Sequence, residues 1–160
     1  MSAGVGAPAG TVIDKSTESE NVVNDDERSV RLAEIMLSLL QVITLGRMIL
    51  TEIPFPVTLP RIFTPESMNT IVQGFARCMM LLEEEPMKSM ISAQLSFMIM
   101  IGLAKTLNAH DLVGIMATTH EEGDGHKIEE WRYRALELLI DDADATLHLV
   151  HEELNGDALD

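Results

Sequence analysis

Residues 31–51 read RLAEIMLSLLQVITLGRMILT, and this stretch decides the fold. Its polar residues recur at steps of three or four and trace one narrow stripe, whereas apolar residues fill the rest of the helical circumference. A helix with so thin a polar stripe is mostly buried, so it either runs through the middle of a bundle or meets a second copy. We favour the seam between copies, with Leu39 and Ile43 on a well-packed side and Gln41 on the polar stripe.

The segments around this helix predict an all-α bundle of four to five helices. Three prolines in residues 53–63 forbid a helix there and favour an extended segment that crosses the bundle. Thr64 and Pro65 are typical of a helix start. Beyond this crossing segment, helices are predicted over 64–85, 87–107, 108–117 and 126–155, with an exposed loop over 118–125 and a stop at Asn155-Gly156.

The two ends of the chain differ from this bundle in composition. Residues 1–24 are rich in small and polar residues without periodicity, so we expect a flexible arm that folding does not require. Helical capping chemistry begins at Asn24, and the helical bundle is predicted over 25–156. Residues 157–160 form a short acidic C-terminal tail in this interpretation.

The charge is negative and unevenly placed. The net charge is −15, and residues 120–160 alone carry thirteen acids and three bases. Direct nucleic-acid binding needs a basic stripe that displaces phosphate counterions, and the sequence contains none. Two interpretations stay open: the acids steer the protein to a basic partner, or they form a solvated face.

Cysteine content and hydropathy indicate a reduced, soluble, intracellular protein, or one held within a viral particle. Cys78 is the only cysteine and lies in an apolar run, which favours a small core residue over a nucleophile. The longest uncharged stretch, 89–104, has sixteen residues and is too short to span a bilayer, which takes roughly 20 residues. We therefore expect no membrane span.

Two groups of residues could in principle bind a metal ion. One face of the last predicted helix presents carboxylates and imidazoles at helical-neighbour spacing: Asp141, Asp144, His148 and His151. The duplicated Glu-x-x-His pairs of di-iron bundles are absent, and the loop from His120 to His126 matches neither zinc-protease nor calcium-loop spacing. We expect no metal, no cofactor and no catalytic residues, and a metal-dependent enzyme is the third hypothesis for function.

Methionine is the more unusual signal. The chain has eleven Met, and six of them fall within residues 79–100, where flexible thioethers suit either an irregular core or an adaptable partner surface. The leading hypothesis is a non-enzymatic assembly component or adaptor that binds itself, a basic protein, or both, by analogy of type with viral and phage assembly factors. The alternative is an acidic decoy that blocks the nucleic-acid site of a basic protein. The candidate interaction residues are Leu39, Ile43, Met79, Met80, Met87, Met90, Glu152 and Glu153.

Overall fold

A computed structural model describes the backbone of residues 2–159 and the side chains of residues 26–156. Within these residues there are five α-helices, one 3-10 turn and no strand, which confirms the all-α class. The elements are α1 (Ser2–Thr51), α2 (Pro65–Leu82), α3 (Met87–Met90), α4 (Ala93–Glu121), η1 (Gly125–Lys127) and α5 (Glu130–Leu159).

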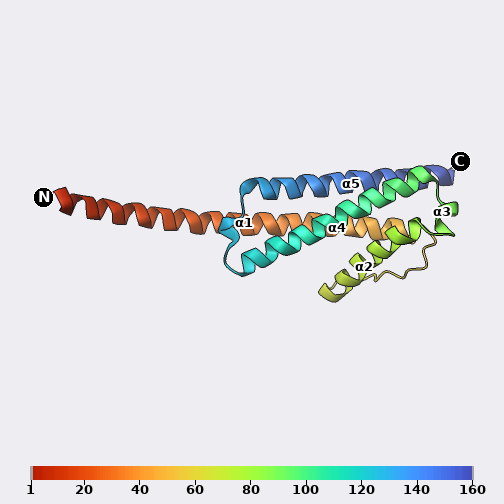
Figure 1. The fold of residues 1–160 in the computed structure, drawn as a ribbon, viewed down its shortest axis with the longest axis horizontal. Coiled ribbons are helices and arrows are strands. Elements are labelled where there is room, and N and C mark those ends of the chain that lie inside the picture. The colour runs from red at the N-terminus through yellow and green to blue at the C-terminus, as the bar shows by residue number, and fades with distance from the viewer. Residues whose placement is uncertain (1, 160) are drawn as a thin grey trace.

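Three long helices form the body of the bundle. Figure 1 shows α5 along one side of α1, α4 running obliquely beside both, and α2 on the far side of α4. The core is mostly aliphatic, and the rings of Phe75 and Tyr133 are fully buried in it. Close approach of α4 and α5 depends on Gly102, where a Cβ atom would stand 2.7 Å from Cδ2 of Leu147. A larger residue at position 102 therefore has no room unless Leu147 moves.

The proline segment packs across the bundle, as the sequence predicts. Ile53 and Leu59 are buried, and Leu59 lies directly against Gly74 of α2. The guanidinium of Arg47 on α1 donates a hydrogen bond to the carbonyl of Pro60. These contacts tie the extended chain to both helices that it connects.

The start and end of α2 also agree with the sequence. The Thr64 side chain accepts a hydrogen bond from the backbone N–H of Ser67 at 3.1 Å, and the Ser67 hydroxyl accepts one from the Thr64 N–H at 2.7 Å. This reciprocal capping box fixes the first turn, with Pro65 at its first position. The helix ends at Leu82, directly before the acidic run of residues 83–85.

The predicted division of residues 87–117 is wrong. The break lies at Ile91, which is extended, and Ser92 then caps α4 by accepting a hydrogen bond from Leu95 N–H at 3.2 Å. From there α4 continues through Asn108 to Glu121, so no separate helix begins at residue 108. Asn108 costs a helix less than about 1 kcal/mol, which the burial of the next turns outweighs.

Two boundaries of α5 also differ from the prediction. The helix begins at Glu130 rather than near residue 126, because η1 occupies residues 125–127. It continues past Asn155-Gly156 to Leu159, since Gly156 does not adopt the positive φ that terminates a helix. The acidic tail predicted over 157–160 lies outside the residues whose side chains are described.

The N-terminal part of α1 extends beyond the other helices (Figure 1). Its backbone is helical from Ser2, without a new start at Asn24. Extending an existing helix adds one hydrogen bond per residue and needs no further nucleus, which is the physical reason for this difference. The side chains of residues 1–25 lie outside those described, so the flexibility expected of residues 1–24 stays a prediction.

Candidate functional site

An open apolar groove lies between α1 and α4, and the first turn of α2 contributes Met68 to it. Its volume is about 610 Å³. We call it the α1–α4 groove. It is lined by aliphatic and thioether side chains with one histidine: Ala33, Met36, Leu37, Leu39, Leu40, Ile43, Met68, His110, Val113, Gly114 and Ala117.

The groove exists because α2 is shorter than its neighbours. The 29 residues of α4 extend for about 43 Å, whereas the 18 residues of α2 extend for about 27 Å. Figure 1 shows α2 beside only one part of α4. The rest of the valley between α1 and α4 has no helix over it, and that uncovered part is the α1–α4 groove.

The walls and the floor of the groove differ in exposure. Leu37 is 61% exposed and Met36 is 46% exposed, whereas Leu39 and Ile43 are only 5% and 1% exposed. Leu39 and Ile43 are therefore buried within a single chain, and Gln41 is exposed as predicted. The sequence predicts a seam between two copies at Leu39 and Ile43. This prediction is wrong, because the chain's own helices already bury both residues. Among the α1 residues that line the groove, the large apolar side chains left exposed are Met36 and Leu37.

His110 is the one polar residue in the lining. Its Nδ1 atom is buried and has no hydrogen-bond partner within the part of the chain whose side chains are described. The nearest acid, Asp111, places Oδ1 at 3.6 Å from this nitrogen, which is too far for a hydrogen bond. An occupant of the groove would therefore meet apolar surface everywhere except at this imidazole.

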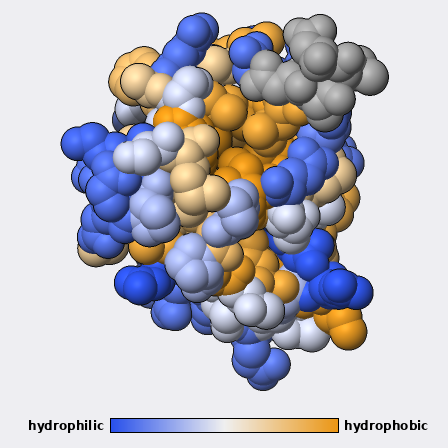
Figure 2. Space-filling view, turned by 90° about the vertical axis from the view of Figure 1, so that its right-hand side faces the viewer, coloured by the Kyte–Doolittle hydropathy of each residue, from blue (hydrophilic) through white to orange (hydrophobic). Residues whose placement is uncertain are grey.

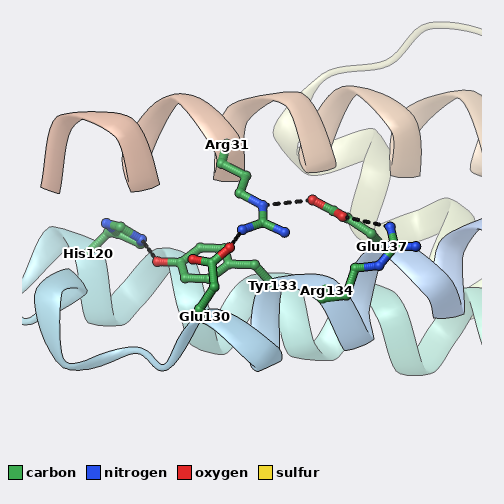
Figure 3. A network of polar contacts seen from close by, with 6 residues as sticks. All are labelled: Arg31, His120, Glu130, Tyr133, Arg134 and Glu137. Carbon is green, nitrogen blue, oxygen red and sulfur yellow. Dashed lines mark hydrogen bonds and ion pairs between the residues drawn. The ribbon is translucent and has the colours of Figure 1, made fainter. Parts of the chain in front are cut away.

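The opposite side of α1 faces α5 and is closed by charged side chains (Figure 3). Arg31 Nε donates to Glu137 Oε1 at 2.8 Å, and the same guanidinium pairs with Glu130. Arg134 Nη1 lies 3.4 Å from Glu137 Oε2. The hydrogen bond from Arg31 lowers the pKa of Glu137 and raises the pKa of Arg31.

Behind these charges, Tyr133 connects the network to the end of α4. Its ring is fully buried, its hydroxyl lies 2.8 Å from His120 Nε2, and the Arg31 guanidinium carbon lies 5.4 Å from the ring centre. Gly125 lies directly against the His120 ring, so a side chain there would clash. The carbonyl of His126 accepts a hydrogen bond from Arg28 at 2.5 Å. The loop from His120 to His126, considered above for metal binding, is thus attached to α1 and α5.

The structure does not bring the proposed metal ligands of α5 together. Asp144 and His148 are neighbours, with 3.4 Å between Oδ1 and Nδ1, but His151 faces Glu52 of α1 at 3.8 Å. His151 Nε2 lies 3.0 Å from the Asn155 side-chain amide. Among the residues with described side chains, no three His, Cys, Asp or Glu are placed to hold a metal ion.

The predicted interaction residues of the methionine-rich region and of α5 are divided between core and surface. Met87 is buried and Met79 is half-buried, whereas Met80 and Met90 are 58% and 59% exposed. Glu152 and Glu153 are exposed. Figure 2, which views the end of the molecule that carries α3 and the C-terminus, shows apolar side chains at its centre with hydrophilic ones around them.

Burial raises the pKa of the Cys78 thiol to about 11, which keeps it protonated and unreactive.

One segment passes a length and composition test for a membrane span. Residues 26–51 of α1 have a mean hydropathy of 1.6 in their most apolar window, of which 39% is buried inside the structure. This segment contains Arg31, Glu34 and Arg47, so it is not the longest uncharged stretch of the chain. The central helix of a bundle passes the same test of length and composition.

Comparison with protein-family models, with curated proteins and with solved structures finds no match for the chain. The chemistry of the α1–α4 groove and of the surfaces around it is therefore what bears on function.

Proposed function

We propose that this chain is a non-enzymatic interaction protein, an adaptor that binds one amphipathic helix of a basic partner in the α1–α4 groove. The observation that carries the proposal is the open groove itself, with Leu37 and Met36 exposed on its wall. Exposed apolar side chains that gather in one groove, rather than standing singly on the surface, are typical of interaction sites.

The size of the groove favours a helix over a larger surface. On α1 the lining runs from Ala33 to Ile43, which is about 15 Å or three helical turns. A bound helix would lie in the same valley between α1 and α4 as α2, and it would cover the part of that valley that α2 leaves open. Such helices are held by apolar anchors at i, i+4 and i+7, and His110 offers one polar contact that can fix their register.

Charge favours a basic occupant. The net charge of the chain is −15. Asp111 is an exposed acid whose carboxylate lies 3.6 Å from His110 of the groove lining, whereas Glu34 lies on the side of α1 that faces α5. A helix with apolar anchors and Lys or Arg on its flanks would gain attraction during approach as well as burial on contact. A second copy of this chain, which carries the same acids, would not.

A peptide experiment tests this proposal. The probe is a helix-forming peptide of about 15 residues with Leu at i, i+4, i+7 and i+11 and Lys on both flanks, titrated into the full chain by calorimetry. We expect saturable binding to one site, weaker at higher salt because screening reduces the attraction. Substituting Leu37→Glu should weaken it at least tenfold, since a charge would be buried against the anchors.

Two controls make the result specific. Leu138→Glu places the same charge at a 51% exposed position of α5, outside the groove, and should leave peptide binding unchanged. A matched peptide with Glu in place of Lys should bind more weakly than the basic one. Equal binding of both peptides, or equal binding by wild type and Leu37→Glu, would overturn the proposal.

A further inference from the structure

A second apolar surface runs along a different face of α4. Phe97, Leu112 and Ile115 are 65%, 44% and 64% exposed, although Phe97 is two positions from the buried Ile99 and Ile115 is two positions from the buried Val113. Two positions are about 200° apart on a helix, so these side chains point away from the core. Together with the intervening residues on the same face of α4, they form a surface that we call the outer stripe. Its members are Phe97, Ile101, Ala104, Asn108, Leu112 and Ile115.

The outer stripe is regular. Its members follow one another at steps of four, three, four, four and three residues, which keeps them on one face of the helix. Ile101 and Ala104 are half-buried, Asn108 is exposed, and none of the six is charged. Lys105, beside the stripe, pairs with Asp142 of α5 at 2.6 Å. The stripe itself is therefore uncharged, and it is flanked by the paired Lys105 and by Asp111, an exposed acid four positions before Ile115.

The spacing is symmetric to within one residue about position 106. Phe97 and Ile115 lie nine positions on either side of it, Ala104 and Asn108 lie two, and Ile101 and Leu112 lie five and six. If two such helices pack antiparallel around a two-fold axis at residue 106, Phe97 meets Ile115 of the second copy and Ile101 meets its Leu112. Ala104, which is small, meets Asn108 near the axis and allows close approach. The stripe is thus complementary to itself, as a two-fold interface requires.

We propose that the outer stripe is a homodimer surface on which α4 of a second copy packs antiparallel. The area indicates a weak dimer. Residues 97 to 115 extend for about 27 Å on a helix about 10 Å wide, so the pair buries on the order of 600 Å² in total, which is below the roughly 1,200 Å² of stable complexes. The contact therefore forms at high protein concentration, and Asn108 opposite Ala104 fixes its register.

Salt distinguishes this surface from the α1–α4 groove. Each copy carries a net charge of −15, so the two chains repel one another at long range while the stripe itself is uncharged. Salt screens the repulsion and leaves the apolar contact in place. Dimerisation through the stripe should therefore become stronger as salt rises, whereas binding of a basic helix in the groove should become weaker. The dimer proposal does not depend on the proposed function.

Sedimentation equilibrium of the full chain tests the proposal. At a low and a tenfold higher NaCl concentration, we expect the average mass to rise from 17.7 kDa toward twice that value with protein concentration, and to rise further at high salt. Ile115→Glu places two acids in the seam and should stay monomeric at every concentration. Leu149→Glu, at a 55% exposed position of α5 outside the stripe, should dimerise like wild type. Circular dichroism checks that each variant is folded.

A crosslinking experiment tests the orientation. In a Cys78→Ala background, Phe97→Cys and Ile115→Cys chains should form a disulfide-linked dimer when mixed and oxidised. Neither should crosslink with itself, because positions 97 and 115 lie about 27 Å apart along the helix. A wild type that stays monomeric at high concentration and high salt, an Ile115→Glu variant that dimerises as well as wild type, or single-cysteine chains that crosslink with themselves would each overturn the proposal.

Discussion

The side of α1 that faces α5 is closed by charged and aromatic side chains, whereas the side that faces the α1–α4 groove leaves aliphatic side chains open to solvent. Arg31 reaches Glu137 and covers the ring of the fully buried Tyr133. On the groove side, Leu37 and Met36 have no such cover. One side of α1 is thus covered by other parts of the chain, whereas the groove side leaves apolar side chains exposed to solvent.

This difference separates stability from binding. Charged side chains at the contact between two helices can stay partly in water at little cost in free energy. The side of α1 that faces α5 therefore needs no further partner. An exposed leucine on a groove wall gains free energy only when something covers it, about 25 cal/mol for each Å² removed from water. The groove side of α1 is therefore where a bound partner would contribute the most favourable free energy.

The largest expected effect sharpens the difference between the floor and the wall of the groove. Leu39→Ala should lower the free energy of unfolding by about 2–5 kcal/mol, because it leaves a cavity in the core. Leu37→Ala, two positions away and 61% exposed, should change it by less than about 0.5 kcal/mol. Urea denaturation at several protein concentrations measures both. A comparable loss for both variants would contradict the difference between floor and wall. A midpoint for Leu39→Ala that depends on protein concentration would place Leu39 at a seam between copies.

The fold could be predicted largely from the sequence where local chemistry is distinctive. Thr64 and Pro65 mark the start of α2, and the prolines of residues 53–63 exclude a helix there. The sequence does not indicate the break at Ile91, because the chain is rich in Met, Ile and Leu on both sides of it and the hydrophobic periodicity does not change there. Asn108 wrongly indicates a helix boundary, because its capping preference is a stronger local signal than its small cost inside a helix.

The groove could be predicted only in part. The sequence shows that α1 has more apolar surface than a few helices can cover, but it does not show which side they cover. That depends on α2 being shorter than α4, which decides that Leu39 is buried and Leu37 is exposed. His110 and Met68 line the groove from other helices, and Arg31 meets Glu137 across 106 positions of sequence. No spacing along the chain indicates contacts of that kind.

A smaller effect should follow from opening the closed side of α1. Arg31→Met keeps the aliphatic stem but removes the hydrogen bond to Glu137 and the ion pair with Glu130, and we expect the free energy of unfolding to fall by about 1–3 kcal/mol. Arg134→Met is the matched control, since Arg134 is 62% exposed and its pair with Glu137 spans 3.4 Å. It should lose less than about 1 kcal/mol. Urea denaturation of both variants gives the comparison, and equal losses would mean that the network contributes no more than an ordinary surface pair.

The smallest expected effect concerns the pH dependence of the same side. The Arg31 hydrogen bond lowers the pKa of Glu137 in the folded chain below its unfolded value of about 4.3. The stability that this carboxylate contributes is therefore complete above that unfolded value and is lost as pH falls through the folded pKa.

Wild type should accordingly lose more stability than Glu137→Gln between about pH 5 and pH 3, by on the order of 1 kcal/mol, because the glutamine has no proton to gain. Leu37→Ala changes only the groove wall and should follow the wild-type pH profile. Urea unfolding at half-unit pH intervals measures the difference, in which the other carboxylates cancel. Parallel profiles for wild type and Glu137→Gln would show that the closed side of α1 is held by its apolar contacts and by Tyr133 rather than by the ion pair.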